Sequence, residues 1–229
     1  MVDIARNLEI VQSKIRAACE RSGRDSDEVT LVAVSKTQSP ESITALAELG
    51  ITNFGENRVQ ELLEKKPKVP RDIIWHMIGH LQTNKVKSVM SEVSFIHSVD
   101  TIRLAKEIDK YAKSYEKIME ILVEINIAGE ESKHGLEPGE LNNFLTEIAV
   151  FPNIMVKGLM CLAPYVENPE ENRLYFRKMR QMFVDNRGLS ANNIDMQYLS
   201  MGMTNDYEVA IEEGANIVRV GTGIFGARN

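Results

Sequence analysis

Lys36 ends a run of apolar residues that has the composition of a buried strand. Residues 31–37 show no alternation of polar and apolar side chains, which is typical of a parallel strand covered on both faces. Side chains alternate along a strand, so Val32, Val34 and Lys36 share one face. A lysine held partly out of water at the carboxyl end of such a strand can lose its proton and attack a carbonyl carbon. The alternative is that Lys36 extends its ammonium group to the rim of the fold.

Arg219 lies inside the last apolar run of the chain, residues 216–220. Arg219 and Gly221 share one face of this strand, so we expect the guanidinium to point into the fold. A buried guanidinium without an acceptor is costly and requires a ligand atom or a carboxylate beside it. Glu56 and Glu124 are the internal carboxylates that could pair with it.

The sequence Gly221-Thr222-Gly223 follows that strand and opens a short final turn of helix. The backbone N–H groups of such a turn and the Thr222 hydroxyl can converge on an anion, although the same tripeptide also fits an ordinary tight turn. Ser200, at the end of the apolar run 196–201, could donate another hydroxyl. Barrel enzymes hold phosphate groups in the loops that follow their last two strands.

A lysine nucleophile, an inward arginine and a phosphate cup together describe a site for pyridoxal 5′-phosphate. Its aldehyde would react with Lys36, its pyridine nitrogen would face Arg219, and its phosphate would rest on the Gly-Thr-Gly turn. Asn57 ends an earlier strand, where its amide could meet the phenolic oxygen or cap the next helix. His76 and His80 have the spacing of a helical metal pair, but a strand end separates them, so we expect no metal site from them.

These residues must be positioned by a repeating pattern of apolar runs, each followed by a helical or turn-like segment. The predicted strands are residues 31–37, 53–57, 73–78, 94–99, 121–127, 155–160, 196–201 and 216–220. Eight such units predict a single (β/α)8 barrel, a TIM-type α/β fold, preceded by an extra amphipathic N-terminal helix over residues 2–22. An open doubly wound sheet is the rival fold, but it usually carries a glycine-rich first turn, which residues 35–38 lack.

Composition limits the partners that the chain could have. The net charge of -6 argues against a general nucleic-acid surface, and we interpret the basic run 65–68 as a solvated loop. Charged residues interrupt the first apolar positions, so we expect neither a signal peptide nor a membrane anchor. The two cysteines, Cys19 and Cys161, have no metal-like spacing and suit buried thiols in a reducing cytoplasm.

Several segments together resemble the pyridoxal-phosphate homeostasis protein family. They are LVAVSKT, NFGENRVQEL, WHMIGHLQTNK, GLMCLAP, LSMGMTND and VRVGTGIFGAR, in this order and over nearly the whole chain. The resemblance implies a barrel similar to the N-terminal domain of alanine racemase. It also implies cofactor-binding roles for Lys36 as an imine, Asn57 beside the ring, Arg219 at the pyridine nitrogen, and Ser200, Gly221 and Thr222 at the phosphate. Thr204 stands where serine is common and Gly223 where alanine is common, and both substitutions keep a donor.

The resemblance implies a carrier or buffer of pyridoxal phosphate, and a small racemase or decarboxylase is the alternative. Length discriminates between them, because a barrel uses residues 1–229 and leaves no second domain to supply a second acid–base residue. Tyr165 is the tyrosine that we can place in a loop at the ligand end, so it is the candidate for that role. We therefore expect a monomeric cytoplasmic carrier that contacts cofactor-dependent apo-enzymes transiently.

Overall fold

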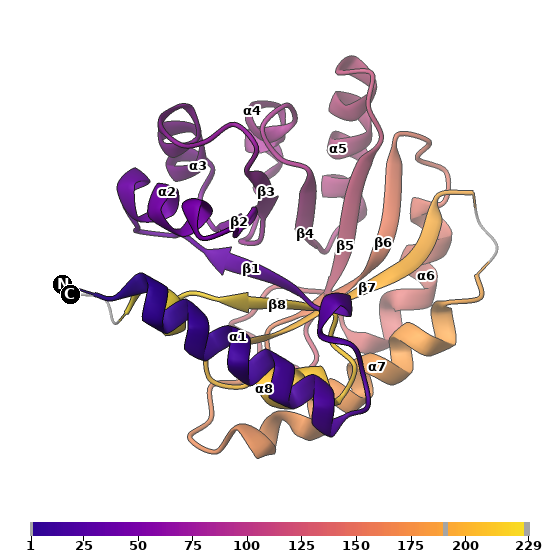
Figure 1. Cartoon of the computed structure of the whole chain (residues 1–229). Coiled ribbons are helices and arrows are strands. Elements are labelled where there is room, and N and C mark those ends of the chain that lie inside the picture. The colour runs from indigo at the N-terminus through magenta and orange to yellow at the C-terminus, as the bar shows by residue number, and fades with distance from the viewer. Residues whose placement is uncertain (1, 190–191, 227–229) are drawn as a thin grey trace.

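The computed structural model describes residues 2–189 and 192–226, and within them eight parallel strands close into a barrel (Figure 1). The strands are β1 (Thr30–Val34), β2 (Asn53–Glu56), β3 (Ile74–Met77), β4 (Phe95–Val99), β5 (Met119–Ile125), β6 (Ile154–Cys161), β7 (Ile194–Met203) and β8 (Ile217–Val220). Each strand pairs with the next, and β8 closes the ring on β1, where Arg219 lies opposite Val32. The predicted (β/α)8 barrel is confirmed.

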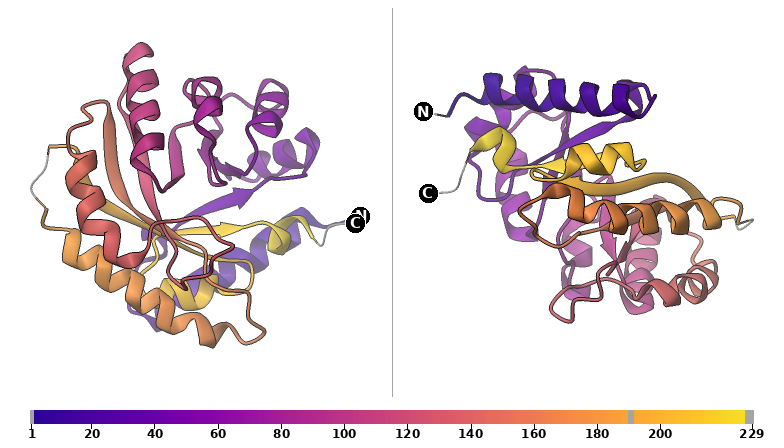
Figure 2. Two further views of the ribbon diagram at one scale, coloured as in Figure 1. Left: turned by 180° about the vertical axis from the view of Figure 1, so that it is seen from behind. Right: turned by 90° about the horizontal axis from the view of Figure 1, so that it is seen from below.

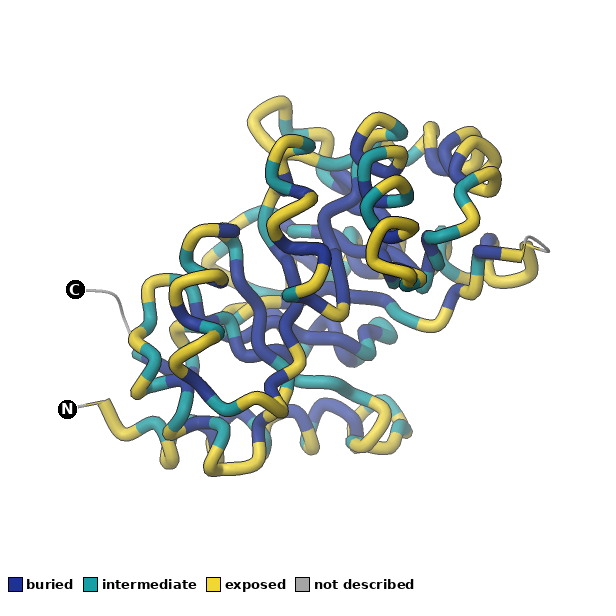
Figure 3. The backbone as a smooth tube through the Cα atoms, turned by 90° about the horizontal axis from the view of Figure 1, so that it is seen from above, coloured by how far each residue is buried: buried dark blue, intermediate teal, exposed yellow. Residues whose placement is uncertain are grey.

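Helices surround the barrel and leave its carboxyl end to loops (Figure 2). In the described residues they are α1 (Ile4–Arg21), α2 (Pro40–Glu48), α3 (Val59–Lys65), α4 (Val86–Val89), α5 (Ile102–Ser114), α6 (Leu141–Ile148), α7 (Arg173–Asn186), α8 (Tyr207–Glu212) and α9 (Thr222–Phe225). Figure 3 shows that buried positions follow the central strands, while exposed positions lie on the outer sides of the helices.

The expected N-terminal helix is present as α1. It begins after Asp3, whose carboxylate accepts a hydrogen bond from the backbone N–H of Arg6 at 3.0 Å, as an N-cap does. Its apolar positions at spacings of three and four are buried: Leu8, Val11, Ile15, Ala18 and Cys19. They pack against α8 and α9, so α1 covers the outside of the barrel rather than closing one end.

The main apolar core lies between the strands and the surrounding helices and includes Phe54, Trp75 and Phe176. Each large side chain buried this completely contributes about 1.5–3 kcal/mol to folding. A smaller cluster of Phe95, Leu122 and Met160 fills part of the barrel interior. Both cysteines are buried and unpaired, as expected.

Some boundaries differ from the sequence prediction. β1 ends at Val34 rather than Thr37, and the chain turns over residues 36–37, where Thr37 takes a left-handed backbone conformation with φ of 66°. Lys36 therefore lies in the turn after the strand. β7 runs to Met203 rather than 201, because it stays paired with β8 through a register shift that matches Met203 with Arg219. The expectation of a solvated loop at 65–68 is wrong, because Lys65 ends α3 and is buried and Lys66–Lys68 form a short 3-10 helix.

Candidate functional site

A cavity of about 400 Å³ opens at the carboxyl end of the barrel, beside a second one of about 320 Å³. Val34, Lys36, Met203 and Arg219 line both of them. The first is also lined by Gln38, Tyr165, Thr204, Asn205, Gly221 and Thr222. The second is lined by Asn57, His80, Glu124 and His134, among others. The barrel thus brings Lys36, Asn57, Arg219, Gly221 and Thr222 together, as the sequence analysis expected.

A buried ion-pair cluster holds the backbone on both sides of Lys36. Lys65 donates to the carbonyl of Ser35 at 2.8 Å, to Glu56 at 2.7 Å and to Glu61 at 2.8 Å. The backbone after Lys36 is fixed because the N–H of Thr37 donates to the carboxylate of Glu61 at 2.7 Å. A lysine that must meet one carbon atom of a ligand gains from a turn that is fixed in this way.

Glu56 is the acceptor at the centre of this cluster and is fully buried. Burial raises the pKa of Glu56, while the Lys65 ammonium and the Ser35 hydroxyl, which donates to the carboxylate at 2.9 Å, act in the opposite direction. Glu56 therefore pairs with Lys65 and not with Arg219, contrary to one of our alternatives. The sequence analysis missed this cluster, although Glu61 and Lys65 have the i, i+4 spacing of a helical ion pair.

Arg219 points into the barrel, as its position in β8 predicted, and is only 3% exposed. Within the described chain, its hydrogen bonds go to the hydroxyl of Ser200 and to the carbonyl of Cys161 at 2.8 Å, rather than to a carboxylate. A guanidinium has five N–H donors, and Arg219 also lines both cavities. Its remaining donors can therefore meet a ligand.

A chain of hydrogen bonds continues from Arg219 through the barrel interior. Ser200 lies 3.2 Å from Nδ1 of His97, Nε2 of His97 lies 3.0 Å from Nδ1 of His76, and Nε2 of His76 lies 3.0 Å from Oδ1 of Asn53. Because Oδ1 of Asn53 can only accept, His76 donates from Nε2 and accepts at Nδ1 from Nε2 of His97, and Nδ1 of His97 then accepts from the Ser200 hydroxyl.

Both histidines of this chain are held neutral. Burial lowers the pKa of His76 to about 4. Burial, and then the charges of His76 and Arg219, lower the pKa of His97 well below its ordinary value. Neutral imidazoles can each donate once and accept once, which fixes the direction of the chain and the orientation of the arginine.

Ser200 does not line the cavity that Gly221 and Thr222 line. It is fully buried beneath Arg219 and is absent from the cavity lining, whereas Thr204 is part of that lining. The Thr204 hydroxyl accepts hydrogen bonds from the backbone N–H groups of Gly221 and Gly223, both at 3.3 Å. A hydroxyl that accepts twice directs its own proton elsewhere, and the cavity is the adjacent space. The extension of β7 to Met203 causes this exchange, because the carboxyl end of the strand lies beyond Ser200.

Asn57 lines the second cavity and carries an amide oxygen without a donor among the described residues. Its Oδ1 is buried and accepts no hydrogen bond from the residues that the structure describes. Gly79 packs against it so closely that a Cβ atom there would lie 2.5 Å from the Asn57 carbonyl oxygen. A buried amide oxygen without a donor is costly, and a donor on a bound molecule would satisfy it.

The comparison with known proteins is consistent over the whole chain. The family "Alanine racemase, N-terminal domain" matches residues 6–229. The pyridoxal phosphate homeostasis protein of Aquifex aeolicus is 45% identical over 228 residues, which cover 99% of both chains. The chain belongs to the pyridoxal phosphate homeostasis protein family.

Solved structures agree with this assignment. A protein described as unknown from Bifidobacterium adolescentis has a TM-score of 0.92 at 34% identity, covering 98% of this chain and 97% of that one. PipY of Synechococcus elongatus with PLP bound has a TM-score of 0.81 at 31% identity, covering 93% and 99%. Alanine racemase from Corynebacterium glutamicum, at 12% identity and a TM-score of 0.69, shares the fold, and this chain covers 61% of its length.

Glu124 adds a titratable group to the second cavity. It is 4% exposed, and burial, followed by the charge of Asp100, raises its pKa to about 7, while the charge of Arg219 acts in the opposite direction. The sequence analysis had considered Glu124 as an ion-pair partner of Arg219, but its position in the cavity lining emerges from the fold.

Across the described residues, no helix is both long enough and apolar enough to span a bilayer.

Proposed function

We propose that this chain binds pyridoxal 5′-phosphate covalently through Lys36 and carries or buffers it inside the cell. The observation that carries the proposal is the convergence of Lys36, Arg219, Asn57 and the Thr204–Gly221 cup on adjoining cavities at the carboxyl end of one barrel. The family name of its 45%-identical relative and the PLP-bound structure of PipY support the choice of ligand.

Three groups of atoms would hold the cofactor. The backbone N–H of Thr222 and the Thr204 hydroxyl would meet the phosphate dianion, and Gly221, whose N–H donates to Thr204, would hold that hydroxyl in place. Arg219 would meet the pyridine nitrogen, and Asn57 would meet a donor on the side of the ring. When bound, the cofactor supplies an electrophilic aldehyde that captures the lysine amine. Thr204 takes the role that we had expected of Ser200.

Arg219 favours a carrier over an enzyme. A guanidinium is effectively never deprotonated, so it donates to the pyridine nitrogen and disfavours protonation there. A ring without that proton withdraws electrons weakly from a bound amino acid. Racemisation also needs a base on each face of the reacting carbon, and Tyr165, the expected candidate for the second base, is 88% exposed.

The lysine assignment is tested by reduction with borohydride after addition of pyridoxal phosphate, followed by peptide mass analysis. The mass increment should appear on the peptide that contains Lys36 and should vanish in Lys36→Ala. Lys133→Ala is the matched control, because Lys133 lies in the wall of the second cavity and its loss should leave the increment in place. An increment found only on other lysines would contradict the proposal.

The carrier role is tested separately by incubating the loaded protein with alanine, serine, lysine and other amino acids. Neither the opposite enantiomer, nor the keto acid, nor the decarboxylated amine should accumulate. Turnover that disappears in Lys36→Ala would replace the carrier with the racemase or decarboxylase alternative.

The remaining expectations belong to the same proposal. We propose one cofactor-binding domain that is monomeric and cytoplasmic and that hands pyridoxal phosphate to apo-enzymes in transient encounters. Light scattering on the purified protein measures its molar mass and tests the monomeric state. The delivery is tested by the rate at which the loaded protein transfers cofactor to an added apo-enzyme, compared with the rate expected when the cofactor is released and diffuses freely.

A further inference from the structure

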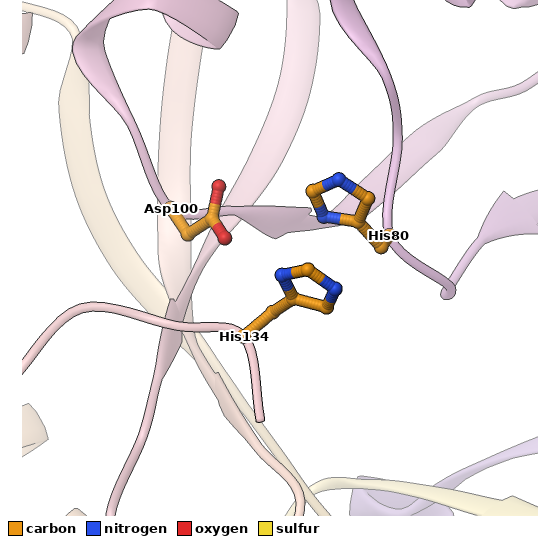
Figure 4. A group of neighbouring side chains, drawn as sticks. All are labelled: His80, Asp100 and His134. Atoms are coloured by element: carbon orange, nitrogen blue, oxygen red, sulfur yellow. The ribbon is translucent and has the colours of Figure 1, made fainter. Parts of the chain in front are cut away.

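Three side chains of the kind that bind metal ions meet at the mouth of the barrel. His80 lies in the loop after β3, Asp100 follows β4, and His134 belongs to the loop between β5 and α6 (Figure 4). One nitrogen of each imidazole and one carboxylate oxygen lie within 4.8 Å of one another. The sequence analysis weighed His80 only with His76, which lies inside the barrel, so spacing along the chain gave no sign of this group.

The two imidazoles lie face to face, so their in-plane nitrogen lone pairs run parallel and must turn by side-chain rotation to meet one ion. Their rings stack with centroids 3.8 Å apart and planes 11° apart. Figure 4 shows a nitrogen of each ring on the side that faces the Asp100 carboxylate. Ligand atoms around a tetrahedral zinc ion lie about 3.3 Å apart when the bonds are ~2.0 Å long. Because His80 and His134 are exposed, rotation of the two side chains can close the present separation.

The loop that carries His134 is anchored to the barrel rim. The backbone N–H of Gly135 donates to Oδ2 of Asp100 at 3.4 Å. The backbone of Leu136 donates to the carbonyl of Glu124 at 2.8 Å and accepts from the N–H of Asn126 at 2.9 Å. Gly135 has a φ of 115°, and a Cβ there would lie 2.6 Å from the backbone nitrogen of Asn126. This packing holds His134 over Asp100, and it orients the carboxylate as outer contacts do for metal ligands.

We propose that His80, Asp100 and His134 bind one divalent transition-metal ion of the zinc class, with water completing its coordination. Two imidazole nitrogens and a carboxylate oxygen suit Zn²⁺ and its late first-row neighbours better than Mg²⁺ or Ca²⁺, which prefer oxygen ligands alone. The ion ties the β5–α6 loop to the rim. His80 and His134 also line the second cavity, so the ion controls access to that side of the site.

The test uses the whole chain without an affinity tag, stripped of metal and free of pyridoxal phosphate, which itself chelates metals. Calorimetric titration with Zn²⁺ should give one ion per chain. His80→Ala and His134→Ala should each weaken binding by more than about tenfold. Glu131→Ala, an exposed change in the same loop, should bind Zn²⁺ as the parent does. Binding that persists unchanged in both histidine variants would overturn the proposal, as would the absence of binding in the parent.

A second measurement locates the ion. Zn²⁺ should slow amide hydrogen exchange in residues 129–135 of the parent and leave the exchange of His134→Ala unchanged. Denaturant midpoints measured without metal should agree among the variants, which shows that each is folded. Slowing of exchange elsewhere in the chain, with residues 129–135 unaffected, would place the ion at another site and refute the assignment.

Discussion

Replacing Lys65 with methionine removes the ammonium group beneath Lys36 while keeping a side chain of similar length. Glu56 then loses its ion-pair partner, and the Ser35 carbonyl loses its donor. The Ser35 hydroxyl remains as a donor to the carboxylate. The change therefore leaves a fully buried carboxylate with two neutral hydrogen bonds, from the Ser35 hydroxyl and from the backbone N–H of Asn57 at 3.3 Å, and no compensating charge.

The expected loss of stability is about 3–5 kcal/mol at neutral pH, which is typical when one partner of a buried ion pair is removed. The loss should depend on pH, because burial already raises the pKa of Glu56 and the Lys65 ammonium no longer opposes it. A folded-state pKa above that of the unfolded chain means that the folded protein holds the extra proton. The penalty should therefore grow as pH rises above the ordinary carboxyl range, by up to about 1.4 kcal/mol per pH unit, and shrink in acid.

Urea unfolding at pH 5 and at pH 8 measures this effect. Lys66→Met is the matched control, since the neighbouring Lys66 pairs with Glu92 at 3.2 Å and its side chain is 33% exposed. Partly exposed pairs of this kind contribute about 1 kcal/mol or less. The double variant Lys65→Met with Glu56→Gln should recover part of the stability, because it removes the unpaired charge.

The same substitution should slow the reaction of Lys36 with pyridoxal phosphate, because the turn that carries Lys36 loses one of its two anchors. The reasoning fails if Lys65→Met costs no more than Lys66→Met, or if its cost is the same at both pH values. A rate of cofactor capture equal to that of the parent would refute the positioning role alone.

Other residues of the site yield predictions with distinct signatures. Glu124→Gln should gain stability relative to the parent as pH rises from 4.5 towards 7, by about 3 kcal/mol in total. The reason is that a pKa of about 7 makes the folded parent hold a proton that the unfolded chain releases. Urea unfolding measures the difference, and a difference that does not change with pH would contradict this. Thr204→Val should weaken pyridoxal phosphate binding by about tenfold and affect pyridoxal much less, measured by absorbance titration. Ser200→Ala should cost about 1–3 kcal/mol of stability, because Arg219 loses a buried acceptor, yet it should leave the affinity ratio of the two vitamers unchanged; a changed ratio would return Ser200 to the phosphate site.

The order of elements and the direction of key side chains could be predicted from the sequence. A strand buried on both faces needs a continuous apolar run, so the runs that form the barrel are visible without knowledge of their partners. Alternation along a strand then determines that Arg219 points inward, whereas Lys36 lies in the turn beyond the end of β1. These are local properties, set by the backbone within a few residues.

The partner of each side chain across the closed barrel could be identified only from the tertiary structure. Ser200 and His97 are 103 positions apart, and only closure of the barrel brings the hydroxyl to the imidazole. Thr204 rather than Ser200 lines the cavity, because β7 extends two residues further than its apolar run. Lys65 appeared to be one of several solvated lysines, and its burial depends on Glu56 and Glu61, which the fold places beside the turn of Lys36. The sequence determined on which face and at which end each side chain would lie, whereas its partner depended on how strands remote in sequence close into a ring.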